Sequence, residues 1–190
     1  LYRPAAHRRL ITRFGQDLRV TSLAFRSMAS WLLGYPEAAL HDADCALTEA
    51  RQIEHAATLM FTLNFPILVN TYCGNYEAAN ERLEELVILA EQKRAPFRKA
   101  EGVLRRGYIL TLTGEATKAV EVVTSGIDLW RSVGSTIFAP EQEFMLAIAH
   151  ADSGLFDDAW RCVDKAMTAM QATSERWCEA EAHRVAGEIA

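Results

Sequence analysis

Gly74-Asn75-Tyr76-Glu77-Ala78-Ala79 recurs in related form at three other places, and this recurrence determines the predicted architecture. The glycines of the four copies, Gly34, Gly74, Gly114 and Gly154, follow one another at intervals of 40 residues. Each is followed five residues later by an alanine: Ala39, Ala79, Ala119 and Ala159. A fixed period of this length over three successive spacings is typical of a repeat protein. We therefore expect stacked structural units rather than one globular core.

Apolar residues flank the glycines at helical spacing on both sides. In the first copy they are Leu23, Met28 and Leu32 before the glycine and Ala39, Ala43, Ala46 and Leu47 after it. Each unit is therefore predicted to be a helix, a tight glycine turn and a second helix. Glycine suits the turn because reversing the chain at a helix end requires a left-handed backbone conformation. The alanine lets the two antiparallel helices approach closely.

The predicted fold class is all-α, a right-handed α-solenoid of helix-turn-helix repeats that forms a single array over residues 1–190. Its predicted parts are a partial helix (1–15), four repeats (17–54, 56–93, 96–133 and 136–172) and a trailing helix (174–190). Pro66 falls inside the first helix of the second repeat, which it is expected to kink or shorten unless that helix starts late. Since the chain starts at Leu1 and stops within a helical pattern, we expect a fragment of a larger protein.

Composition argues against a membrane protein and against a disulfide-stabilised secreted domain. Half of the 190 residues are apolar, but no apolar segment is long enough to cross a bilayer. The four cysteines, Cys45, Cys73, Cys162 and Cys178, form no Cys-x-x-Cys motif and are interpreted as reduced thiols, with a disulfide as the alternative. We expect a cytoplasmic protein.

Charge is distributed unevenly along the chain. Residues 1–26 hold six arginines and one aspartate, whereas the remaining 14 basic and 24 acidic residues give the rest a charge of −10. The arginines are Arg3, Arg8, Arg9, Arg13, Arg19 and Arg26. A basic arm for nucleic acid is one interpretation, and the polar side of a helix is the other. We predict no nucleic-acid binding, because an acidic body repels phosphates and no aromatic platform lies among the arginines.

The chain carries no recognisable catalytic or cofactor motif. It has no phosphate-binding glycine loop with a lysine and no Gly-x-Ser-x-Gly nucleophile turn. His41 and Cys45 share a helix face and are the best candidate metal ligands, but two ligands without a second pair do not make a site. We therefore predict that this segment is not an enzyme and that it has no cofactor and no metal site.

Gly74-x-Tyr76-x-x-Ala79 resembles the turn between the two helices of tetratricopeptide (TPR) repeats. Small residues also fall at that family's small positions, at Ser27, Gly107 and Ala147 in first helices and at Ala46, Gly126 and Ala166 in second helices. Ile67 and Leu86 depart from the pattern. The period of 40 residues exceeds the usual ~34, so the helices or connections are expected to be longer than in the standard repeat.

The C-terminal half resembles a narrower group, the C-terminal helical arrays of large bacterial signalling proteins. The resemblance lies in Gly134, Pro140, the run from Phe144 to Ala149, Gly154 and the segment from Trp177 to Glu188, which contains Trp-x-x-Ala-Glu-x-x-Arg. In that group an adenylate or guanylate cyclase domain, or another output domain, precedes a regulatory ATPase module of the STAND class. The resemblance implies a regulatory or partner-binding segment whose catalytic domains lie upstream.

The resemblance also implies which residues bind a partner, because first helices line the concave face of such an array. The matching positions are Trp31, Asn64, Leu68, Glu101, Arg105, Tyr108 and Glu141. We expect them to bind a protein or peptide segment, or another domain of the same chain. The alternative is that this face meets neighbouring repeats or a second copy through uncapped ends. Trp31 is either a peptide anchor or part of the core, whereas Trp130, Trp160 and Trp177 are expected to fill gaps between helices.

The predicted function is a non-catalytic interaction and regulatory module of a larger signalling protein. The alternative is a small-molecule sensor, in which an effector reshapes the groove of a transcriptional or signalling regulator. A thermal-shift measurement distinguishes the interaction module from the sensor, because a small solute would stabilise only the sensor.

Overall fold

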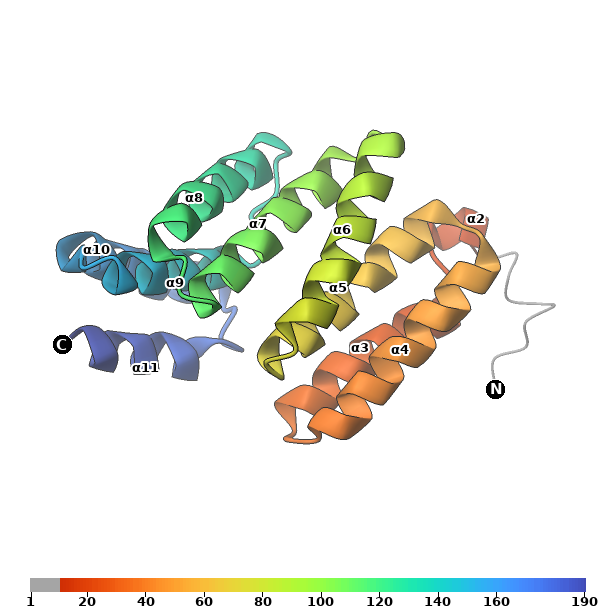
Figure 1. The fold of residues 1–190 in the computed structure, drawn as a ribbon, viewed down its shortest axis with the longest axis horizontal. Helices are drawn as coiled ribbons and strands as arrows, with labels where there is room; N and C mark the ends of the chain where they lie inside the picture. The colour runs from red at the N-terminus through yellow and green to blue at the C-terminus, as the bar shows by residue number, and fades with distance from the viewer. Residues whose placement is uncertain (1–10) are drawn as a thin grey trace. The chain divides into compact units, whose positions relative to one another are not determined.

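The computed structural model describes residues 11–190, and over that range its regular secondary structure consists of helices, without strands (Figure 1). Most of the predicted partial helix and Arg3, Arg8 and Arg9 lie outside the described residues. The helices are α2 (Ile11–Phe14), α3 (Leu18–Leu32), α4 (Pro36–Ile53), α5 (Ala56–Tyr72), α6 (Tyr76–Gln92), α7 (Pro96–Leu112), α8 (Ala116–Ser132), α9 (Ala139–Asp152), α10 (Phe156–Thr173) and α11 (Glu179–Ile189). The prediction of an all-α helical-repeat fold is therefore confirmed.

The chain divides into two compact units, Leu1–Lys99 and Ala100–Ala190, with the boundary inside α7. In the first unit α3 packs on α4 and α5, and α5 packs on α6. In the second unit α9 packs on α8, α10 and α11. Each unit therefore contains helices paired with their neighbours in the chain, which is the packing expected of stacked helix pairs.

The four repeated glycines end α3, α5, α7 and α9 in the same way. Gly34, Gly74, Gly114 and Gly154 have φ between +75° and +84°, the left-handed region. At the first turn the Gly34 N–H donates to the Trp31 carbonyl, and the Tyr35 N–H donates to the Ser30 carbonyl. The same two hydrogen bonds recur at the other three glycines and form the Schellman motif, which satisfies carbonyls at a helix end.

Close helix approach explains the repeated small residues. Ala39, Ala79, Ala119 and Ala159 are completely buried. Gly107 of α7 faces Val123 of α8, and a Cβ added to this glycine would lie 2.5 Å from the Val123 Cγ2 atom. Gly126 of α8 faces Leu104 of α7 with similar closeness. At both glycines the backbone therefore occupies the room that a larger side chain would need.

Pro66 does not shorten the second repeat, because α5 continues for ten residues before it and six after it. The predicted alternative of a late start is therefore wrong. Pro66 is buried, and its carbonyl accepts a hydrogen bond of 2.8 Å from the Asn70 side-chain amide. The proline removes one backbone donor inside the helix, but packing on both sides keeps the segment helical.

The trailing helix begins later than residue 174. Ser174 has a φ of +61° and ends α10, so residues 174–178 connect α10 to α11. Glu175 lies in this connection, where its carboxylate accepts the Phe138 N–H at 3.0 Å. Glu175 therefore does not stabilise the first turn of α11. Instead it links the α10–α11 connection to the α8–α9 connection through this hydrogen bond.

The tryptophans only partly follow the prediction that they fill gaps. Trp130 is buried, and its indole N–H donates to the Ile137 carbonyl at 3.0 Å. Trp160 and Trp177 are each 38% exposed. The prediction that they fill gaps between helices is therefore wrong for the part of each side chain that faces solvent. Trp177 packs edge-on against Phe138 with ring centroids 6.4 Å apart. Trp31 is half-buried and stacks on Tyr72 at 4.4 Å.

Candidate functional site

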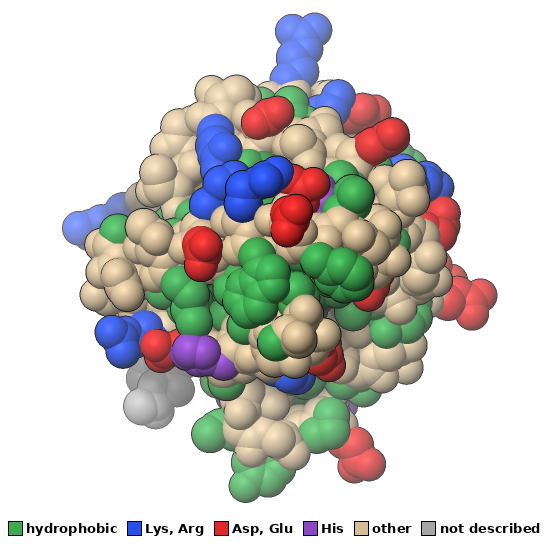
Figure 2. Space-filling model, turned by 90° about the vertical axis from the view of Figure 1, so that its left-hand side faces the viewer, with side chains coloured by type: hydrophobic (Ala, Val, Ile, Leu, Met, Phe, Trp, Pro, Cys, Tyr) green, Lys and Arg blue, Asp and Glu red, His purple; other side chains and the backbone are tan. Residues whose placement is uncertain are grey.

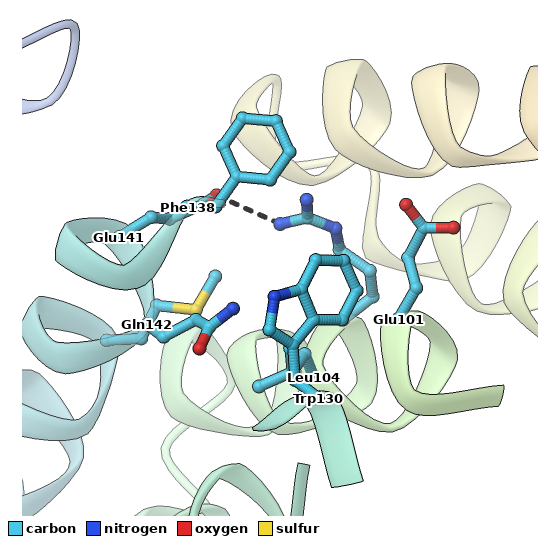
Figure 3. Close-up of a pocket in the computed structure, with 8 residues that line it drawn as sticks. Glu101, Leu104, Trp130, Phe138, Glu141 and Gln142 are labelled. Carbon is cyan, nitrogen blue, oxygen red and sulfur yellow. Dashed lines mark hydrogen bonds and ion pairs between the residues drawn. The ribbon is translucent and has the colours of Figure 1, made fainter. Parts of the chain in front are cut away.

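Four of the predicted partner-binding residues lie in the second unit, and three of them line one small cavity (Figure 3). Glu101 and Arg105 come from α7, and Glu141 comes from the first turn of α9. The other lining residues are Leu104, Trp130, Phe138, Gln142 and Met145. In Figure 3, Gln142 extends from α9 on the side of the cavity opposite Glu101.

A buried ion pair dominates this cavity. The Arg105 Nη1 donates to the Glu141 Oε1 at 2.9 Å, and the two side chains are only 7% and 3% exposed. Removing two charges from water costs several kcal/mol, which the pairing must offset. Arg105 was predicted to bind a partner segment. Instead, Arg105 forms a buried ion pair with Glu141 of the same chain, so its charge does not face a partner.

The cavity is too small for a metabolite. Its volume is about 10 Å³, which is room for about one water molecule. The Gln142 Nε2 is buried and has no hydrogen-bond partner within the described residues. Burial raises the pKa of the nearby Tyr108 hydroxyl, and the carboxylate of Glu141 raises it further. Tyr108 is therefore a neutral buried phenol here.

The remaining predicted residues, Trp31, Asn64 and Leu68, lie in the first unit. Asn64 and Leu68 are buried within α5, and Trp31 lies at the end of α3 against Tyr72. These three residues therefore present little free side-chain surface in the first unit.

An exposed aromatic surface in the first unit was missed by the sequence analysis. Phe25 of α3 contacts two rings of α5 edge-to-face. The ring centroids are 5.7 Å apart for Phe25 and Phe61 and 5.2 Å apart for Phe25 and Phe65. The guanidinium of Arg98, in the first turn of α7, lies 5.4 Å from the centre of the Phe61 ring. Phe65 is buried, whereas Phe25 is 57% exposed. We call Phe25, Phe61, Phe65 and Arg98 the aromatic patch.

The aromatic patch and the ion pair occupy equivalent positions of the repeat. Phe25 and Phe61 are 36 residues apart in the chain, as are Arg105 and Glu141. Phe65 and Arg105 follow Phe25 by one and two periods of 40 residues. The same contact between successive first helices is thus made by two aromatic rings in the first unit and by opposite charges in the second. The sequence does carry a signal for the patch, because phenylalanine recurs one period apart, at Phe25 and Phe65.

A second exposed apolar region lies at the start of α10. Leu155, Phe156 and Trp160 are all exposed there, and Phe156 is 54% exposed. Figure 2 shows the side of the molecule on which Figure 1 draws α10. Hydrophobic side chains gather in the middle of this view, and charged side chains surround them. Phe156 of the second unit is thus nearly as exposed as Phe25 of the first unit, and the two phenylalanines can be compared directly.

The two candidate metal ligands on α4 are not part of a larger cluster within residues 11–190. The His41 Nε2 and the Cys45 Sγ lie 3.6 Å apart on α4, but no group of three or more potential metal ligands gathers anywhere in that range. No described helix combines the length and hydropathy that a transmembrane span needs.

Comparison with known proteins supports the fold. No protein-family model matches the chain, and no curated protein matches it. Among solved structures it is similar to nearly identical TPR-like repeats of a Podosopora anserina protein assigned as a kinesin light chain, with a TM-score of 0.61 and 13% identity over 90% of this chain and 93% of that one. A variant of that protein with a single substitution gives the same TM-score and identity over 92% of its own length. The chain therefore has a TPR-like helical-repeat fold.

Proposed function

We propose that this chain is a non-catalytic module that binds a protein or peptide segment. The single observation that carries the proposal is the aromatic patch, where a phenylalanine of α3 stays 57% exposed beside two further rings. Large aromatic side chains are enriched where proteins bind one another, because they bury much area at low entropic cost. The TPR-like fold provides a rigid set of helices for this surface.

The wider role that we propose is regulatory, within a larger cytoplasmic bacterial signalling protein linked to a cyclase or a STAND ATPase. Its support is the resemblance in the C-terminal half of the sequence. The bound segment then comes from another protein or from another domain of the same chain. The buried ion pair favours this binding role over small-molecule sensing, because it fills the cavity between α7 and α9 with the chain's own charges.

The proposal is tested by panning a phage-displayed library of twelve-residue peptides against immobilised residues 1–190. Synthetic copies of enriched peptides are then measured by fluorescence anisotropy, and we expect micromolar Kd values. A thermal-shift screen of nucleotides and metabolites runs in parallel, because ligand binding to the folded state raises Tm. A library that yields no binder, together with stabilisation by a small solute, would contradict the proposal and support the sensor function.

A further inference from the structure

The charges of the first unit are segregated by helix. Residues 18–32, 56–72 and 96–99, the parts of α3, α5 and α7 in this unit, contain four basic residues and no acidic one. The basic residues are Arg19, Arg26, Arg98 and Lys99. The second helices α4 and α6 instead carry nine acidic residues and two arginines. The helices that carry the aromatic patch are thus the basic ones.

Arg26 of α3 and Arg98 of α7 belong to the helices that carry the patch. Arg26 follows Phe25 in the chain, and its Nε and Nη2 donate to the Asp42 carboxylate at 2.5 and 2.6 Å. This pairing leaves the Nη1 amino group of Arg26 for another acceptor, because a guanidinium has five N–H donors. The Arg26 side chain is 63% exposed, so that amino group can be reached from solvent. The Arg98 guanidinium lies over the Phe61 ring of the patch.

We propose that the aromatic patch binds a peptide segment in which a large apolar side chain is flanked by carboxylates. This inference rests on the proposed function and names the partner chemistry of its site. The apolar side chain covers the exposed part of Phe25, and carboxylates lie near Arg26 and Arg98, where charge attraction is strongest. A nucleic acid fits less well, since the rings meet edge-to-face and do not form the stacking platform that bases need.

The test uses three synthetic dye-labelled peptides of twelve residues. The first has one Phe and one Leu flanked by aspartates and glutamates, the second has lysines in place of the acids, and the third has alanines in place of Phe and Leu. Fluorescence anisotropy measures each Kd with residues 1–190 at 50 and 300 mM salt. We expect the acidic peptide to bind at least tenfold more tightly than either counterpart and to weaken at high salt.

Two matched variants locate the site. Phe25→Ala is expected to weaken binding of the acidic peptide at least tenfold, whereas Phe156→Ala, which removes an equally exposed ring from the second unit, leaves Kd unchanged. Arg98→Ala is expected to reduce the salt dependence. Circular dichroism checks that all three variants fold, and substitution of these partly exposed side chains leaves the helices intact.

Three outcomes would overturn the inference. The first is an acidic peptide that fails to bind or that binds Phe25→Ala and Phe156→Ala alike, the second is a lysine peptide that binds equally well, and the third is a thymidine dodecamer that binds more tightly. If library panning has meanwhile given binders that are insensitive to Phe25, only this inference fails and the proposed function stands. If panning has given no binder, the proposed function fails as well.

Discussion

At the scale of single residues, one repeat position carries two kinds of chemistry. Phe25 and Phe61 meet as rings in the first unit, and Arg105 and Glu141 meet as charges in the second, each pair 36 residues apart. The glycine period could be predicted from sequence because a left-handed turn leaves little choice of residue. The burial of Arg105 and Glu141 could not, because it depends on the partner that faces each side chain.

The ion pair gives the largest expected effect of a point substitution. Arg105→Met removes the cation that pairs with the buried Glu141 carboxylate, and we expect a loss of about 3–5 kcal/mol in unfolding free energy, measured by urea denaturation. The double variant Arg105→Met/Glu141→Leu should recover part of this loss, since residue 141 then no longer carries a buried charge. Arg51→Met, which breaks the exposed pair with Glu85, should cost less than about 1 kcal/mol. Equal losses for Arg105→Met and Arg51→Met would contradict the buried pair.

A pair of glycine substitutions tests the close approach of α7 and α8. Gly107→Ala places a Cβ 2.5 Å from the Val123 Cγ2 and 3.1 Å from the Val123 backbone nitrogen, so we expect a loss of about 1–3 kcal/mol. Gly187→Ala meets nothing within 4 Å in α11 and should gain about 0.5–1 kcal/mol, because alanine is the better helix former. Thermal melts followed by circular dichroism compare the two variants. A stabilising Gly107→Ala would show that the two helices lie further apart.

At the scale of elements, the turns explain which boundaries could be predicted. The sequence indicated every turn that contains a repeated glycine, and α3, α5, α7 and α9 end there. The predicted end of the second repeat at residue 93 lies next to the end of α6, but the left-handed conformation of Arg94, with a φ of +51°, was not predicted. The sequence analysis also misplaced the start of α11, because Ser174 looks like a helix cap in sequence but adopts the left-handed conformation that ends α10. Connections held by serine or arginine thus lack the signal that glycine gives.

The turn at Arg94 predicts a stabilising substitution. The Arg94 N–H donates to the Glu91 carbonyl and the Ala95 N–H donates to the Ala90 carbonyl, as at the glycine turns. Arg94→Gly keeps these hydrogen bonds and removes the cost of a left-handed non-glycine residue, so we expect a gain of up to about 1 kcal/mol. Gly114→Ala, the reverse change at a glycine turn, should lose about 1 kcal/mol. Urea denaturation measures both, and a destabilising Arg94→Gly would contradict the assigned conformation.

At the scale of the whole molecule, the fold follows from the period, whereas the function depends on surfaces that differ between the two units. The 40-residue rhythm predicted an all-helical repeat because each helix pair needs neighbours to cover its apolar side. It could not predict that Phe25 stays exposed while Arg105, at the equivalent position two repeats later, is buried. That difference arises from what packs around each helix.

Two buried thiols of the second unit give the stability of the chain a pH dependence. Burial raises the pKa of Cys162 and of Cys178 from about 9 to about 11, and the carboxylates of Glu143 and Glu141 contribute to the rise. Between pH 9 and 11 the thiols ionise in the unfolded chain but not in the folded one. The unfolding free energy is therefore unaffected below pH 9 and falls above it, by about 1 kcal/mol per thiol at pH 10.

Urea denaturation at pH 8 and pH 10 checks this thiol dependence. The wild type should lose more stability between the two pH values than Cys162→Ala/Cys178→Ala, whatever the baseline stability of the double variant. Identical losses in the two proteins would show that these thiols are not buried as described.

The most direct measurement of the binding account is a chemical-shift titration of ¹⁵N-labelled residues 1–190 with the acidic Phe- and Leu-containing peptide. The account predicts that the largest shifts occur in residues 18–32, 56–72 and 96–99, the helices that carry the aromatic patch. Shifts concentrated in α4 and α6, or around Phe156 of α10, would contradict it.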